Sequence, residues 1–114
     1  MKINENVEIQ VDKEFSTLWV SIGSRTELYY SYKVLNDIYS MIQLLPDIIR
    51  MEKTKYIVFL SLNKTVWNMG GDLELFAKCV RTIQPDILKD YAYKCIDVVY
   101  NFNNSFETDA LTAL

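Results

Sequence analysis

The chain has 114 residues, of which 50% are hydrophobic and 24% charged, a composition typical of one globular domain rather than a disordered segment. Its net charge is −3 and it contains no basic run, which argues against a nucleic-acid surface. It contains no histidine, which excludes a Ser-His-Asp triad or a histidine-ligated metal within these residues.

Near the N-terminus, alternating apolar and polar residues predict two strands. Residues 7–11 alternate valine and isoleucine with polar side chains, residues 12–14 interrupt the pattern, and residues 18–22 resume it. Together they predict a hairpin at the edge of a sheet, ending at Gly23, followed by a loop over residues 24–30.

A long helix is predicted next, with Ser31, or Asn36 together with Asp37, at its start. Pro46 lies inside it and is expected to kink the helix or divide it in two. The apolar stripe of this helix is Val34, Leu35, Ile38, Met41, Ile42, Leu45, Ile48 and Ile49. A cluster of tyrosines, expected to pack at a subunit or domain edge, consists of Tyr29, Tyr30, Tyr32 and Tyr39.

The centre of the chain reads as a strand, a short loop and a helix. Residues 56–60 form a β-branched and aromatic run that is typical of a buried strand. The loop ends in Gly70-Gly71-Asp72, and a helix is predicted from Asp72 to about Ile83. Its apolar repeat is Leu73, Phe76, Ala77 and Val80.

Two interpretations of Gly70-Gly71-Asp72 remain open. The first N–H groups of a helix are unpaired and positively biased, and glycine leaves them accessible, which suits a negative or developing-negative oxygen. The same residues also make an ordinary turn in which Asp72 is the N-cap. We favour structural roles over a general acid/base pair: Asp72 caps the helix, and Glu74 lies on its first turn, where its charge complements the helix dipole.

The last long helix is predicted to start at Pro85, with Asp86 in its first turn, and to end in the turn-forming residues 101–105. Its predicted apolar face is Leu88, Tyr91, Ala92, Cys95, Ile96, Val99 and Phe102. The two cysteines, Cys79 and Cys95, are expected to be buried free thiols in a reducing compartment. No apolar run is long enough to span a membrane and no signal peptide is evident, so we expect a cytoplasmic location.

The chain finishes in an apolar, strand-like run over residues 109–114. Because termini usually lie exposed at the surface, we expect this sequence to be the N-terminal part of a longer protein.

The segment YIVFLSLNKTVWNMGGDLELF, residues 56–76, resembles the first signature of the crotonase (enoyl-CoA hydratase/isomerase) superfamily. With its continuation AKCVR and the later LKDYAYKCIDVVY, it is most similar to the diffusible-signal-factor synthases, which make cis-2-unsaturated fatty-acid signals. The resemblance implies an α/β fold, with residues 1–114 forming the N-terminal part of a single crotonase-like ββα spiral domain. Its parts would be an edge hairpin, a central strand, three main helices and the start of a further strand.

The resemblance also implies site residues. Gly71 would supply one backbone amide of an oxyanion hole that polarises the carbonyl of an acyl-CoA or acyl-carrier-protein thioester. No cofactor or metal beyond this thioester is implied. The ligand would be lined by Trp67, Asn68, Met69, Gly70 and Asp72, with Leu73 and Phe76 facing the acyl chain. Trp67 is equally well read as a hydrophobic plug over the helix.

In the resembled synthases the second oxyanion amide and the two glutamates that handle water and protons lie in a second half, which this sequence lacks. The first hypothesis is therefore a partial enzyme, inactive alone, from a protein expected to form trimers. Two alternatives are a non-catalytic acyl-CoA-binding or regulatory module of the same fold, and an interaction domain without a ligand.

Overall fold

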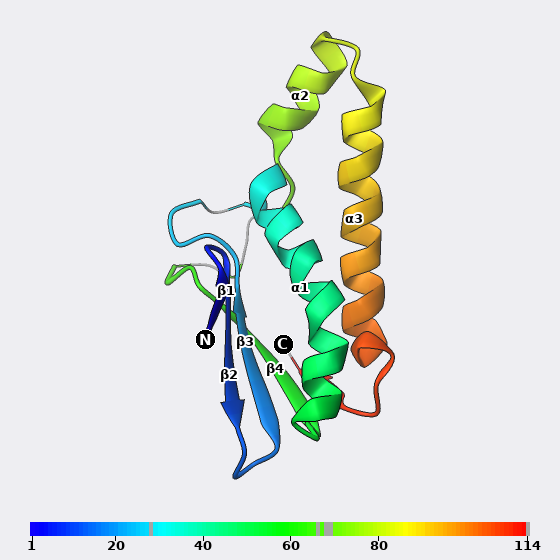
Figure 1. Cartoon of the computed structure of the whole chain (residues 1–114). Helices are drawn as coiled ribbons and strands as arrows, with labels where there is room; N and C mark the ends of the chain where they lie inside the picture. Colours follow the sequence, from blue (N-terminus) through cyan, green and yellow to red (C-terminus); the bar gives the residue numbers. More distant parts are fainter. Residues whose placement is uncertain (28, 66, 68–69, 114) are drawn as a thin grey trace.

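A computed structural model describes residues 1–27, 29–65, 67 and 70–113. Within them, one sheet is covered on one face by helices (Figure 1). Helix α1 lies against the sheet and α3 runs beside α1, while α2 extends past the end of the sheet. The elements in chain order are β1 (Lys2–Asn4), β2 (Val7–Asp12), β3 (Thr17–Ile22), α1 (Tyr32–Met51), β4 (Tyr56–Ser61), α2 (Leu73–Arg81), α3 (Pro85–Asn103), the 3₁₀ turn η1 (Ser105–Glu107) and β5 (Leu111–Ala113).

The sheet has the order β1-β2-β3-β4-β5. The predicted hairpin is confirmed as the antiparallel pair β2 and β3, with Val7 opposite Ile22. Strand β1 was not predicted: it pairs with β2 and takes the edge position that we expected the hairpin to hold. The missed strand has only three residues, too few for an alternating pattern to show in the sequence.

Strands β3, β4 and β5 are parallel, and helices make both connections between them. Because the carboxyl ends of parallel strands meet at one edge of a sheet, the segments that follow β3 and β4 come together there. An isolated parallel bridge between Tyr30 and Gly71 joins these two segments. The topology thus brings Gly71 beside the start of α1.

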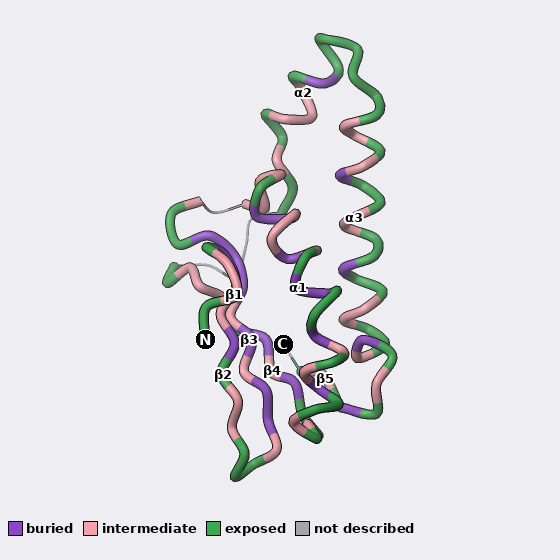
Figure 2. Tube along the Cα trace, viewed as in Figure 1, coloured by how far each residue is buried: buried purple, intermediate pink, exposed green. Residues whose placement is uncertain are grey.

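The core lies between the sheet and the helices, as the buried positions in Figure 2 show. Alternate residues of β2, β3 and β4 point into it, including Ile9, Val20 and Phe59. The α1 stripe is confirmed for seven residues, which are buried: Val34, Leu35, Ile38, Met41, Ile42, Leu45 and Ile49. Beneath the end of α3, Phe59 stacks on Phe102 with ring centroids 4.2 Å apart, and Phe106 lies 5.8 Å from both.

Helix α1 begins as one of the predicted alternatives: Ser31 is its N-cap and accepts a hydrogen bond from the Val34 N–H at 3.2 Å. Of the two outcomes expected at Pro46, a kink or a division, the structure excludes division, because α1 runs unbroken from Tyr32 to Met51. Proline removes one N–H from the helical ladder, but Leu45 and Ile49 on either side are anchored in the core and hold the segment against the sheet.

Helix α3 starts at Pro85 as predicted, with Asp86 in its first turn. Its predicted apolar face is wrong in part, because Ile96 and Val99 are 61% and 67% exposed. Ala92 is exposed as well. The buried residues of α3 are Tyr91, which the prediction included and which contacts Tyr32 of α1, and Val98, which it did not include.

The predicted face of α2 also differs from the observed one: Leu73 and Val80 are exposed, and the buried residue of this helix is Cys79. Helix α2 extends beyond the sheet and packs mainly on α3, so only a narrow strip of it is covered. Both cysteines are free, as predicted, although Cys95 is only half-buried. Burial raises the pKa of the Cys95 thiol, so its uncharged form predominates near neutral pH.

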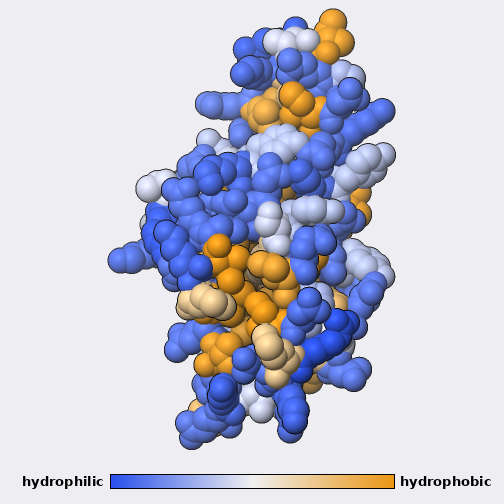
Figure 3. Space-filling model, in the orientation of Figure 1, coloured by the Kyte–Doolittle hydropathy of each residue, from blue (hydrophilic) through white to orange (hydrophobic). Residues whose placement is uncertain are grey.

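The face of the sheet that the helices do not cover carries several apolar side chains. A shallow apolar hollow on this face is lined by Phe15, Trp19, Tyr56, Val58, Leu111 and Ala113, among others. Figure 3 shows a separate gathering of hydrophobic side chains in the lower centre of the view, between the strands and helix α1. Among the described residues, no helix has the length and hydropathy needed to cross a membrane.

Candidate functional site

The Gly70-Gly71-Asp72 turn leads from the β4 edge of the sheet into α2, the order predicted for it. Asp72 is the N-cap, with an extended backbone, and its Oδ1 accepts a hydrogen bond from the Leu75 N–H at 3.1 Å. Glu74 is exposed on the first turn of α2. The capping role predicted for Asp72 is therefore confirmed, and its carboxylate is already engaged by the helix.

The two positions favour glycine for different reasons. Gly70 has φ +93°, in the left-handed region that side chains other than glycine rarely adopt. Gly71 has an ordinary φ, but a Cβ there would lie 3.0 Å from the Phe76 ring. The first glycine turns the chain, and the second lets the backbone lie directly on an aromatic ring.

The N–H of Gly71 is the notable group of this turn. The residue is exposed, and its N–H donates no hydrogen bond to any other described residue. Its neighbours on both sides are fixed: the Tyr30 N–H donates to the Gly70 carbonyl at 3.0 Å, and the Asp72 N–H donates to the Tyr91 hydroxyl at 3.3 Å. A donor of an exposed residue at a helix N-terminus, with both neighbouring residues held by hydrogen bonds, can bind an anionic or strongly polarised oxygen.

Of the other predicted site residues, Phe76 contacts Gly71 and Leu73 is the first residue of α2. Trp67 is 39% exposed, and its carbonyl accepts a hydrogen bond from the Ser61 hydroxyl. Leu73 is 76% exposed, whereas Phe76 is half-buried and meets Tyr91 edge to face at 5.2 Å. Asn68 and Met69 fall outside the described residues.

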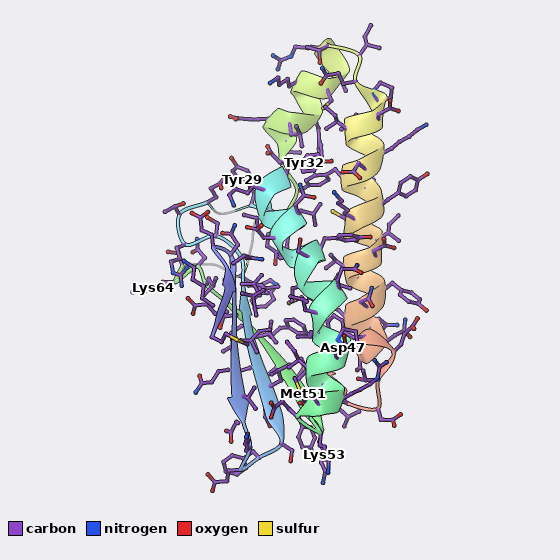
Figure 4. All side chains as sticks on the ribbon, in the orientation of Figure 1. Tyr29, Tyr32, Asp47, Met51, Lys53 and Lys64 are labelled. Atoms are coloured by element: carbon purple, nitrogen blue, oxygen red, sulfur yellow. The ribbon has the colours of Figure 1, made fainter. Side chains whose placement is uncertain are left out.

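Three tyrosines that were not predicted as site residues lie at or near the turn. Tyr30 and Tyr91 bond to the backbone of the turn, and Tyr29 lies near α2 at the start of α1, where Figure 4 labels it with Tyr32. Burial and then Glu27 raise the pKa of the Tyr29 phenol, with smaller contributions from Asp72 and Glu74. The sequence did offer a signal for Tyr91, which lies in the predicted apolar face of α3. A buried hydroxyl needs a hydrogen-bond partner, so a polar contact at this position could have been expected.

Beside the turn, a surface hollow of about 550 Å³ runs along α2. Its lining combines apolar side chains at the helix start with two cations further along, namely Leu73, Glu74, Ala77, Lys78 and Arg81. Such a surface can accommodate a ligand that has both an apolar and an anionic part.

Replacing the cap tests this local architecture. We expect Asp72→Ala to lower the free energy of unfolding by about 1 kcal/mol, because the Leu75 N–H loses its acceptor. Glu74→Ala, on the same helical turn but without a capping bond, should change it by less than about 0.5 kcal/mol. Urea denaturation of the two variants provides the measurement, and equal effects would contradict the capping role.

The sheet, its helical crossovers and this turn define a mixed α/β unit in which a helix N-terminus lies at the carboxyl edge of parallel strands. No protein-family model matches the sequence, and no curated protein matches it either. Among solved structures, the fold is similar to that of an enoyl-CoA hydratase from Geobacillus kaustophilus HTA426, with a TM-score of 0.64 and 12% sequence identity. The match covers 89% of this chain and 35% of that enzyme, so the chain spans about a third of its length. The fold is therefore crotonase-like at the level of its α/β architecture.

Proposed function

We propose that this chain binds an acyl thioester at the N-terminus of α2, with the thioester carbonyl accepting a hydrogen bond from the Gly71 N–H. One observation carries the proposal: on a crotonase-like fold, Gly71 is an exposed residue directly before the N-cap of α2, and its N–H donates to no other described residue. The position also matches the amide-donating residue of the crotonase signature that residues 56–76 resemble.

The chemistry follows from where charge develops. When a thioester forms an enolate or a tetrahedral intermediate, negative charge collects on the carbonyl oxygen. A fixed N–H at the positive end of a helix stabilises that charge more than it stabilises the neutral carbonyl. The hollow along α2 supports the same ligand class, since Leu73 and Ala77 offer apolar contact and Lys78 and Arg81 offer charge complementary to phosphates.

The finer proposal concerns a larger protein. It would dehydrate a 3-hydroxyacyl thioester to a 2-enoyl thioester and water, and then hydrolyse the thioester to a free 2-enoic acid signal and a thiol. The similarity of residues 56–76 to the signal synthases supports this reaction, as does the position of Gly71. In that proposal the protein is cytoplasmic, forms trimers and needs no cofactor beyond the thioester.

The chain alone is proposed to bind without turnover. The Asp72 carboxylate caps α2 and Glu74 is exposed on the first turn of that helix, which supports structural roles for both carboxylates. This observation equally favours a second candidate, a non-catalytic acyl-CoA-binding module, which differs from the first in lacking any catalytic partner segment.

The test is a titration of the purified chain with a medium-chain 2-enoyl-CoA whose thioester carbonyl carries ¹³C. A Trp19→Phe background leaves Trp67 as the sole tryptophan. We expect saturable quenching of Trp67 fluorescence and a shift of the labelled carbonyl stretch to lower frequency, because the carbonyl accepts a hydrogen bond. Free CoA should quench without an infrared signal. Absence of binding by the acyl-CoA would overturn the proposal.

A further inference from the structure

The hydroxyl of Tyr91 joins three segments that are distant in the sequence. Tyr91 lies on α3 and is only 3% exposed. Its hydroxyl donates a hydrogen bond to the Tyr30 carbonyl, just before α1, and accepts one from the Asp72 N–H at 3.3 Å, at the start of α2. One phenol on α3 therefore links the segment before α1 to the turn before α2.

The aromatic ring of Tyr91 packs against the Phe76 ring, which contacts the turn at Gly71. It meets the Phe76 ring at 5.2 Å and 84°, an edge-to-face contact, and Phe76 is the ring on which Gly71 lies. A Cβ built at Gly71 would be 3.0 Å from Phe76 and 3.7 Å from the Tyr91 hydroxyl. A displacement of the Tyr91 phenol would therefore change the packing around Gly71 directly.

The arrangement also orients the backbone. The Tyr91 hydroxyl engages the N–H that follows Gly71, while Tyr30 engages the carbonyl that precedes it. These bonds occupy the polar groups on either side of the Gly71 N–H, and that N–H itself donates to no other described residue. Burial raises the pKa of the Tyr91 phenol, so the hydroxyl keeps its proton near neutral pH and can donate to the Tyr30 carbonyl.

We infer that Tyr91 is a positioning residue: its hydroxyl fixes the backbone of the Gly71–Asp72 turn so that the Gly71 N–H points outward as a donor. The inference rests on the proposed function for its consequence, since the oriented donor is the one proposed to bind the thioester carbonyl. A phenylalanine at this position would fill the same space, so the hydroxyl alone carries the effect.

The experiment compares Tyr91→Phe with Tyr32→Phe. Both variants keep an aromatic ring of the same cluster and lose its hydroxyl. Tyr91→Phe loses the two hydrogen bonds to Tyr30 and Asp72, whereas Tyr32→Phe loses the bond to Asp90, which is not part of the turn. The first readout uses the ligand-free full chain: amide chemical shifts and hydrogen exchange at Gly71 and Asp72 by NMR. We expect exchange at Asp72 to rise about fivefold in Tyr91→Phe, with a changed Gly71 amide shift, and to stay at the wild-type rate in Tyr32→Phe.

The second readout is the infrared shift of the ¹³C-labelled enoyl-CoA carbonyl, expected to diminish in Tyr91→Phe and to persist in Tyr32→Phe. If the wild-type chain gives no carbonyl shift, the proposed function fails while the ligand-free readout still tests the positioning role. Amides at Gly71 and Asp72 that respond no more to Tyr91→Phe than to Tyr32→Phe would overturn the inference. So would a lowered unfolding midpoint with unchanged turn amides, because the hydroxyl would then serve stability alone.

Discussion

Phe59→Ala is expected to lower the free energy of unfolding by about 3–5 kcal/mol, the usual cost of removing a buried phenylalanine ring. Phe59 is 1% exposed on β4, stacked on Phe102 of α3 and in contact with Phe106 of η1. It thus links the sheet to the last helix and to the turn before β5. A chain of this size is stable by only about 5–15 kcal/mol, so the variant should unfold about 10–20 °C lower in a thermal melt.

The matched control is Leu60→Ala, one residue along the same strand. Leu60 points to the uncovered face of the sheet and is 42% exposed, so its truncation should cost less than about 1 kcal/mol. Similar melting temperatures for the two variants would mean that Phe59 is not in the core, and that the helices do not cover the face assigned to them.

Gly71→Pro is expected to abolish the infrared shift of the bound thioester carbonyl and to weaken acyl-CoA binding about fivefold. Proline removes the N–H that is proposed to donate to the carbonyl, and one hydrogen bond of this kind is worth about 1 kcal/mol in binding. The two hydrogen bonds that hold the turn use the Gly70 carbonyl and the Asp72 N–H, and proline at position 71 removes neither of these groups. In enzymes, loss of one oxyanion donor lowers turnover by about 10²–10³-fold, because the bond strengthens in the transition state.

Gly71→Ala separates the lost donor from the added bulk. Alanine keeps the N–H but places a Cβ 3.0 Å from the Phe76 ring, as proline does. We expect the alanine variant to retain the infrared shift, with a modest loss of stability that proline shares. Loss of the shift in both variants would point to the ring contact, and retention in both would contradict a donor role for Gly71.

Much of the secondary structure could be predicted from local patterns. Alternation over residues 7–11 and 18–22 predicted β2 and β3. Asp72 and Pro85 marked the starts of α2 and α3, and Ser31 was one of the two starts predicted for α1. Such signals work because caps, proline at the first helical turn and side-chain periodicity each act within a few residues of the chain.

The faces of α2 and α3 could not be predicted in the same way. Ile96, Val99 and Leu73 have the hydrophobicity of core residues, yet they are exposed because α1 covers a different side of α3 and the sheet does not reach α2. Hydrophobicity indicates that a residue can be buried, but whether it is buried depends on which other element packs against it. The unbroken course of α1 through Pro46 has the same origin, since its neighbours Leu45 and Ile49 are anchored by tertiary contacts.

By itself, the sequence determined the order of strands and helices and the glycine turn that opens α2, because these depend on short-range chemistry. The tertiary structure alone decided that Tyr30 and Tyr91, 41 and 19 residues from Gly71 and Asp72 respectively, clasp that turn. The parallel strands β3 and β4 bring their carboxyl ends to one edge of the sheet. Helix α3 passes this edge and places the Tyr91 hydroxyl against the segments that follow the two strands. The orientation of the Gly71 N–H is thus a property of the assembled sheet and helices, which no local pattern encodes.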